Sequence, residues 1–141
     1  MTINLDFDGT LVSQAFPRVG KNIGAQKILK ELLYNQHKLI LFTVRWDCPT
    51  NPENNYLTQA VNWFKENDIE LYGVQCDPEQ SSWTNSPKSC AQLMIDDSAL
   101  GCPIKYDTTI SLKPFADWEK IREILIEKGL IKKPIPTQTE K

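Results

Sequence analysis

Two carboxylates, Asp6 and Asp8, lie two residues apart after a short apolar run near the N-terminus. Residues two apart on a strand point to the same side, so two like charges would meet where a buried strand ends. Such a pair is costly to ionise unless a cation binds. Gly9 allows a sharp turn out of the strand, and Thr10 adds a hydroxyl and a backbone N–H. The stretch predicts a site for Mg²⁺ and an anion, although a ligand-free Asp-rich turn is the plain alternative.

The rest of the chain alternates apolar runs with amphipathic stretches. Strands are expected at residues 2–7, 39–44, 71–74 and 93–95, with a fifth, edge strand at 104–106, and helices at 22–36, 57–67 and 118–128. Alternating strands and helices predict an α/β fold with a mainly parallel sheet and helices on both faces. Residues 1–132 then form one domain, and residues 133–141 form a flexible C-terminal tail.

Other polar residues also stand where buried strands end. Thr43 closes the run at 39–44, the pair Asp96 and Asp97 closes the run at 93–95, and Lys88 lies in the approach to that run. Ligands of such sheets bind beyond the carboxyl ends of the strands. We therefore expect these side chains to meet Asp6 and Asp8 at one edge of the sheet.

This set of residues suits phosphoryl transfer. One carboxylate can attack phosphorus to give an aspartyl phosphate, and a second can protonate the leaving alkoxide and then deprotonate water. Lys88 would neutralise charge on the phosphoryl oxygens, and Thr43 would donate a hydrogen bond to one of them. The acidic pair would complete the oxygen shell that Mg²⁺ prefers.

At this point the sequence resembles the haloacid dehalogenase (HAD) superfamily of phosphohydrolases. The first motif of that family, DxDGT, stands here as residues 6–10, and its second, an apolar strand ending in Thr or Ser, stands at residues 39–43. Its third, a lysine before the last core strand, is best matched by Lys88. Its fourth, an apolar strand ending in acidic residues, stands at residues 93–97. The resemblance implies a Rossmann-like, HAD-like core.

The resemblance also implies roles for individual residues. Asp6 would be the nucleophile and a metal ligand. Asp8 would be the general acid and base and would give its backbone carbonyl to Mg²⁺. Thr43 and Lys88 would hold the phosphoryl group.

The fourth motif and the lysine leave alternatives open. Asp97, which precedes Ser98, resembles the direct metal ligand of the family, and Asp96 would then act through water. Lys105 is a weaker alternative to Lys88, because it follows the acidic pair rather than preceding it.

The carboxylate at Asp8 favours a phosphatase over a dehalogenase or phosphonatase, which lack an acid at the matching place. One helix and a loop account for the residues between Asp8 and Thr43, and loop, helix, strand and loop account for those between Thr43 and Lys88, so we expect no cap domain. An uncovered site suits a bulky substrate or closure by a neighbouring subunit in a homo-oligomer. The family's mutases keep the second carboxylate, but they depend on a cap, so its absence disfavours that reaction.

Substrate choice would then depend on residues at the strand ends. Gly9 and Thr10 are expected beside the phosphate, Arg45 could pair with a second phosphate or carboxylate, and Trp46 or Trp83 could stack on a base or sugar. Polynucleotide 3′-phosphatases are capless relatives with a similar strand–Thr–x–Arg turn, so a nucleic-acid end is one candidate substrate. A phosphorylated small molecule is the other.

Two non-catalytic alternatives remain. A signalling receiver domain also combines acidic residues, Thr and Lys on a parallel sheet, but in another order along the chain. A phosphate-binding protein without activity would be expected to lack one of the motif residues.

Bulk properties narrow the class. The net charge is −2 and the sequence pI is about 5.4, which gives no general support for nucleic-acid binding. No apolar run is long enough to cross a membrane, and no signal peptide is recognisable. The four cysteines lack a CxxC spacing and His37 is the one histidine, so we expect free thiols in a cytoplasmic protein rather than a zinc site.

Overall fold

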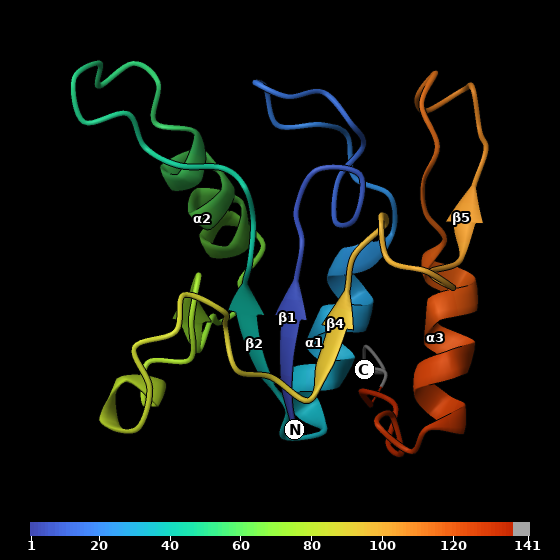
Figure 1. The fold of residues 1–141 in the computed structure, drawn as a ribbon. Helices are drawn as coiled ribbons and strands as arrows, with labels where there is room; N and C mark the ends of the chain where they lie inside the picture. Colours follow the sequence, from blue (N-terminus) through green and yellow to red (C-terminus); the bar gives the residue numbers. More distant parts are fainter. Residues whose placement is uncertain (137–141) are drawn as a thin grey trace, which may run out of the picture.

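A four-stranded parallel sheet forms the centre of the computed structural model, which describes residues 1–136 (Figure 1). Its strands are β1 (Thr2–Leu5), β2 (Lys38–Leu41), β3 (Gly73–Val74) and β4 (Leu93–Ile95), in the order β3-β2-β1-β4. The predicted α/β domain with a parallel sheet is thereby confirmed. Residues 9–87 consist of β2, β3, helices and loops of this one domain, so that part of the chain holds no cap domain.

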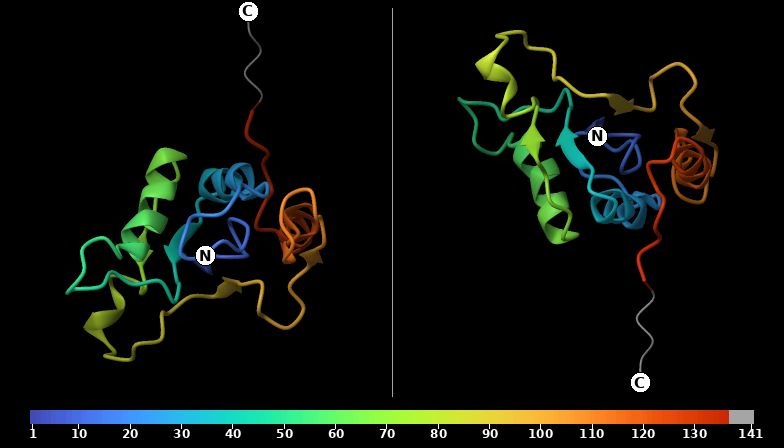
Figure 2. Two further views of the ribbon diagram at one scale, coloured as in Figure 1. Left: turned by 90° about the horizontal axis from the view of Figure 1, so that it is seen from above. Right: turned by 90° about the horizontal axis from the view of Figure 1, so that it is seen from below.

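Three helices share one core with the sheet. They are α1 (Ala25–Tyr34), α2 (Tyr56–Glu66) and α3 (Trp118–Glu127). Their buried side chains Leu29, Phe64 and Leu125 pack in the same cluster as Ile3 and Leu5 of β1. Seen from either end of the strands, α1 and α2 lie on one side of the sheet and α3 lies beyond β4 (Figure 2).

The opposite face of the sheet differs from the expected arrangement. Asn4 of β1 is buried there and exchanges hydrogen bonds with Ser89, and the segment 75–92 covers it with one short 3₁₀ helix, η1 (Gln80–Ser82). That segment contains two prolines and few apolar residues, so it does not sustain an amphipathic α-helix.

Several element boundaries also differ from the sequence prediction. Helix α1 begins at Ala25 rather than at residue 22, because Gly24 before it has φ +92°. The expected edge strand at 104–106 is β5 (Ile104–Lys105), which does not join the main sheet. It pairs antiparallel with β6 (Phe115–Ala116), a strand that the sequence pattern did not indicate.

The C-terminal segment is partly anchored. The backbone N–H groups of Lys132 and Lys133 donate to the side-chain oxygen of Asn35, and its amide donates to the carbonyl of Lys133. The predicted tail therefore begins later than residue 133, and its residues 137–141 lie outside the described part of the chain. All four cysteines are free, and none of the described helices is long and apolar enough to cross a membrane.

Candidate functional site

Three carboxylates meet at the carboxyl edge of the sheet, as the strand pattern predicted. Asp6 follows β1, and Asp96 and Asp97 follow the neighbouring strand β4, whose last residue accepts the N–H of Asp6 at 3.0 Å. One oxygen from each of the three carboxylates lies within 4.8 Å of the others. The donors are all oxygen, which is the ligand type that Mg²⁺ and Ca²⁺ take in proteins.

The electrostatics of Asp6 also fit a cation. Burial, and after it the nearby charge of Asp96, raises the pKa of the Asp6 carboxyl to about 7, against opposing hydrogen bonds from Phe7 and Thr10. Two carboxylates that share a small site cannot both ionise cheaply. A bound divalent ion would remove that cost.

Thr10 holds the cluster together. Its fully buried hydroxyl lies 3.0 Å from Oδ2 of Asp6 and 2.9 Å from Oδ1 of Asp97, and it accepts the N–H of Asp97 at 2.9 Å. The N–H groups of Gly9 and Thr10 donate to backbone carbonyls of the same turn. In the structure Thr10 fixes the carboxylates, and contact of Gly9 and Thr10 with a substrate stays a prediction.

The close approach of Asp97 explains the glycine of the first motif. Gly9 has φ +78°, and a Cβ at that position would lie 2.6 Å from Oδ2 of Asp97 and 2.6 Å from Nε2 of Gln14. A side chain at residue 9 would meet both strain and collision. Gln14 also donates to the backbone carbonyl of Asp8 at 3.3 Å, the carbonyl that the family resemblance assigns to the metal.

Asp8 has a partner that the sequence prediction did not anticipate. Its two carboxylate oxygens accept hydrogen bonds from Nε and Nη2 of Arg45 at 2.7 and 2.8 Å. Arg45 is buried and directed into the protein, whereas Trp46 beside it is 58% exposed. The interpretation of Arg45 as a substrate ligand is therefore wrong, because its guanidinium already has protein partners.

Thr43 is held by Gln75, a residue that sequence reasoning missed. The side chain of Gln75 accepts the N–H of Thr43 at 2.9 Å and donates to the carbonyl of Thr43 at 2.7 Å and to that of Arg45 at 3.2 Å. The Thr43 hydroxyl accepts the N–H of Arg45 at 3.1 Å. Gln75 follows the end of β3 with φ +67°, and that position at a strand end is the one signal that could have indicated it.

Lys88 lies on an anchored segment. Its carbonyl accepts from buried Gln80 at 3.0 Å, and its neighbour Ser89 bonds Asn4. Asp6 directly follows β1, two residues after Asn4, so its side chain projects from the face that the segment around Lys88 and Ser89 covers. The Lys88 side chain is exposed and forms no ion pair within residues 1–136. Lys105 belongs to the separate β5–β6 pair, which leaves Lys88 the better candidate.

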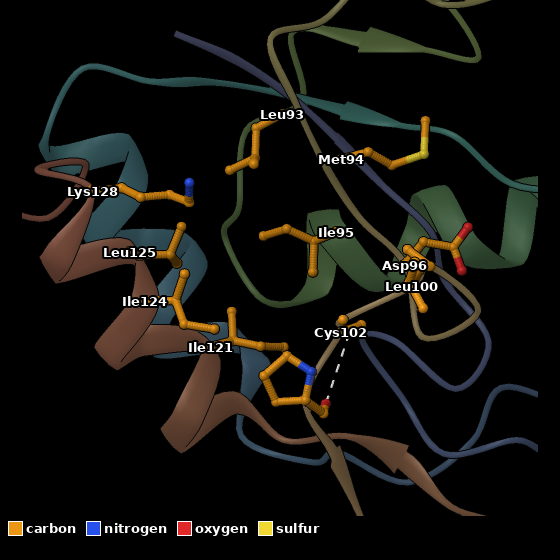
Figure 3. Close-up of a pocket in the computed structure, with 13 residues that line it drawn as sticks. Leu93, Met94, Ile95, Asp96, Leu100, Cys102, Ile121, Ile124, Leu125 and Lys128 are labelled. Carbon is orange, nitrogen blue, oxygen red and sulfur yellow. Dashed lines mark hydrogen bonds between the residues drawn. The ribbon is translucent and has the colours of Figure 1, made fainter.

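A cavity of about 240 Å³ lies between β4 and α3. It is lined mainly by apolar side chains such as Ile95, Ile121 and Leu125. Asp96 belongs to its lining, but the carboxylate points away from the apolar side chains (Figure 3). This cavity is therefore separate from the acidic cluster.

The fold and the cluster define the class of protein: a small α/β protein with three carboxylates at the carboxyl edge of a parallel sheet. The chain is similar to a solved structure of a conserved protein from Bacteroides thetaiotaomicron, at 35% identity over 91% of each chain and with a TM-score of 0.70. It belongs to the same family as that protein. No family model and no curated protein matches the chain.

Proposed function

We propose that the protein is a Mg²⁺-dependent phosphatase of the HAD type, which hydrolyses a phosphomonoester through an aspartyl phosphate on Asp6. The observation that carries the proposal is the meeting of Asp6, Asp96 and Asp97 within 4.8 Å at the end of adjacent parallel strands. Asp8 follows β1, Thr43 follows β2 and Lys88 precedes β4, in the order that the family motifs require.

The residues divide into metal ligands and reacting groups. Asp6 and Asp97 would hold Mg²⁺ directly, Asp96 through water, and Asp8 through its backbone carbonyl. The bound ion supplies positive charge that lets a phosphate dianion approach a carboxylate. Thr43 and Lys88 would bind the phosphoryl oxygens.

The reaction has two steps. An oxygen of Asp6 attacks phosphorus, the bond from phosphorus to the leaving oxygen breaks, and Asp8 gives that oxygen its proton. Water then attacks phosphorus and loses a proton to Asp8. The bond between Asp6 and phosphorus breaks, which releases phosphate and restores both carboxyl groups.

The substrate class follows from the open site. The loops that follow β1, β2 and β4 stand around the carboxyl edge without a covering domain (Figure 1). This suits an exposed phosphate on a larger molecule as well as a phosphorylated small molecule. A 3′-phosphorylated nucleic-acid end is one such substrate, although the net charge of −2 does not favour a polyanion. The uncovered edge also suits an oligomer, and a cytoplasmic location remains part of this proposal.

One observation favours a second function. Arg45 donates one hydrogen bond to each oxygen of Asp8, and an Asp8 held only for structure would suit a protein that binds Mg²⁺ and phosphate without turnover, in the manner of a receiver-like signalling domain. Such a protein would form a stable phosphoryl adduct or none.

The test is phosphate release at millimolar Mg²⁺ from an aryl phosphate, an alkyl phosphate, a panel of phosphorylated metabolites and a 3′-phosphorylated oligonucleotide. The proposal expects turnover that chelation of the metal abolishes. Asp6→Asn should abolish it as well while keeping the far-UV circular dichroism of the wild type. A wild-type protein that binds Mg²⁺ and turns over none of these substrates would favour the binding function instead.

A further inference from the structure

The guanidinium of Arg45 is buried beside the proposed proton donor. Its side chain is 0% exposed, and that of Asp8 is 13% exposed. Nε and Nη2 of Arg45 donate to the two oxygens of Asp8 at 2.7 and 2.8 Å. This two-pronged contact fixes the plane of the Asp8 carboxylate as well as its position.

The other N–H groups of Arg45 reach two further segments. Nη2 donates to the carbonyl of Arg18 at 2.8 Å, and Nη1 donates to the carbonyls of Tyr56 at 3.1 Å and Pro17 at 3.4 Å. A guanidinium has five N–H donors, and these contacts use all of them. Arg45 therefore has no donor left for a substrate.

Two aromatic rings enclose the same group. The Cζ atom of Arg45 lies 5.1 Å from the ring centroid of Phe7 and 5.2 Å from that of Phe16. Phe16 in turn meets Tyr56 edge to face at 5.1 Å. The exposed loop 16–18 is thus attached to the site through Arg45, by its backbone and by its aromatic side chain.

We propose that Arg45 is a positioning residue that clamps loop 16–18 and Asp8 in one arrangement, so that this loop forms a fixed wall of a site that has no cap. The catalytic part of this inference rests on the proposed phosphatase function, whereas the clamp itself does not. Asp8 keeps its role in proton transfer, because the contact with Arg45 uses one lone pair on each oxygen and leaves the other free.

The clamp predicts protection of one peptide bond. Trypsin cleaves after arginine, and the carbonyl of Arg18 is the group that Arg45 holds. The bond between Arg18 and Val19 lies in an exposed loop, so only its anchoring protects it. In Arg45→Met we expect cleavage at this bond to be faster by about tenfold or more, because cleavage follows the population of the opened loop.

A matched control is available in Arg122→Met. Arg122 forms the same kind of two-pronged ion pair with Glu31, at 2.8 Å for both contacts, away from loop 16–18. Arg122→Met should leave the rate of cleavage after Arg18 within about twofold of wild type. Arg45→Lys should be intermediate, because an ammonium cannot reach both oxygens of Asp8 and three carbonyls. If Arg45→Met fails to fold, Arg45→Lys replaces it in the cleavage test.

The catalytic part has its own readout. Misplacing a general acid harms a poor leaving group far more than a good one, and positioned proton transfer contributes roughly 100-fold or more. In Arg45→Met we expect kcat to fall about 100-fold for an alkyl phosphate and less than about tenfold for p-nitrophenyl phosphate. Arg122→Met should leave kcat unchanged for both substrates.

The outcomes separate the two claims. Faster cleavage after Arg18 in both Arg45 variants, with folded circular dichroism, supports the clamp even if the wild type releases no phosphate. Unchanged cleavage in a folded Arg45→Met or Arg45→Lys protein overturns it. Equal losses of kcat for both leaving groups in an active enzyme overturn the positioning of Asp8 while leaving the phosphatase proposal intact.

Discussion

Thr10 and Asp97 are joined by two hydrogen bonds although they stand 87 positions apart in the chain. The Thr10 hydroxyl lies 2.9 Å from the Asp97 carboxylate and accepts the backbone N–H of Asp97 at 2.9 Å. These contacts connect the turn after β1 with the turn after β4. The spacing of the three carboxylates therefore depends on a residue that is not itself a metal ligand.

Thr10→Val should loosen this connection. The valine leaves the Asp97 N–H without its acceptor, and an unsatisfied buried donor costs about 1–3 kcal/mol. We expect that loss in urea unfolding, together with a Mg²⁺ affinity lower by about tenfold in calorimetric titration. Thr10→Ser keeps the hydroxyl and should remain near wild type. A valine variant that binds Mg²⁺ as tightly as wild type would show that the carboxylates do not need Thr10.

Gly9→Ala should harm the site more than the fold. A left-handed backbone costs roughly 1–2 kcal/mol for an alanine, and the added Cβ would also collide with Asp97. Gly24→Ala is the matched control, because Gly24 has φ +92° and a Cβ added there would have no atom within 4 Å. Thermal unfolding should show a larger destabilisation in Gly9→Ala, because only there does a collision add to the backbone strain. Only Gly9→Ala should lose the increase in Tm that Mg²⁺ gives; equal responses to Mg²⁺ would contradict the crowding at Asp97.

The stability of the metal-free protein should depend on pH through Asp6. Its pKa is raised from 3.8 to about 7 on folding, so the folded state binds the proton more tightly than the unfolded state. The stabilising contribution of that proton is complete below pH 3.8 and is lost as the pH rises to about 7. Stability without metal should therefore fall across this range, and Asp6→Asn should remove that part of the slope. Denaturant unfolding at several pH values, with chelator present, measures it.

Mg²⁺ binding should have the opposite pH dependence. The ion must displace the proton of Asp6, so its affinity should weaken by up to about tenfold for each pH unit below about 7. The increase in Tm with Mg²⁺ should accordingly be larger at about pH 8 than at about pH 5.5. An affinity that does not change between these two values would argue that Asp6 is not a ligand.

Gln75→Leu should release the turn that carries Thr43. The variant loses the partner of the Thr43 N–H and of two carbonyls, so the hydroxyl of Thr43 is no longer fixed. We expect KM for an aryl phosphate to rise about tenfold, as the loss of one hydrogen bond to a charged group would predict. Gln36→Leu tests the backbone strain alone, because Gln36 has φ +68° in an exposed turn away from the site. Similar KM values in Gln75→Leu and Gln36→Leu would show that Gln75 does not position Thr43.

The sheet could be predicted from the sequence because apolar runs mark β1, β2 and β4. The acidic cluster could be predicted because the carboxyl ends of neighbouring parallel strands lie at one edge of the sheet. The pairing of Asp8 with Arg45 could not be predicted, because the loop after β2 alternates exposed Val44, buried Arg45 and exposed Trp46 without an apolar pattern. Likewise β6 is only two residues long and directly follows Pro114, so pairing with β5 rather than an extended apolar run makes the strand.

Phosphorylation of Asp6 can be tested by trapping the phosphoenzyme. Asp8→Asn lacks the base that activates water, so incubation with an aryl phosphate and Mg²⁺ should let the phosphoenzyme accumulate. After acid quenching, peptide mass spectrometry should find one phosphoryl group on the peptide that contains Asp6, and chelation of Mg²⁺ should prevent it. A phosphoryl group on another residue, or none in a protein that still releases phosphate from the substrate, would show that Asp6 is not the nucleophile.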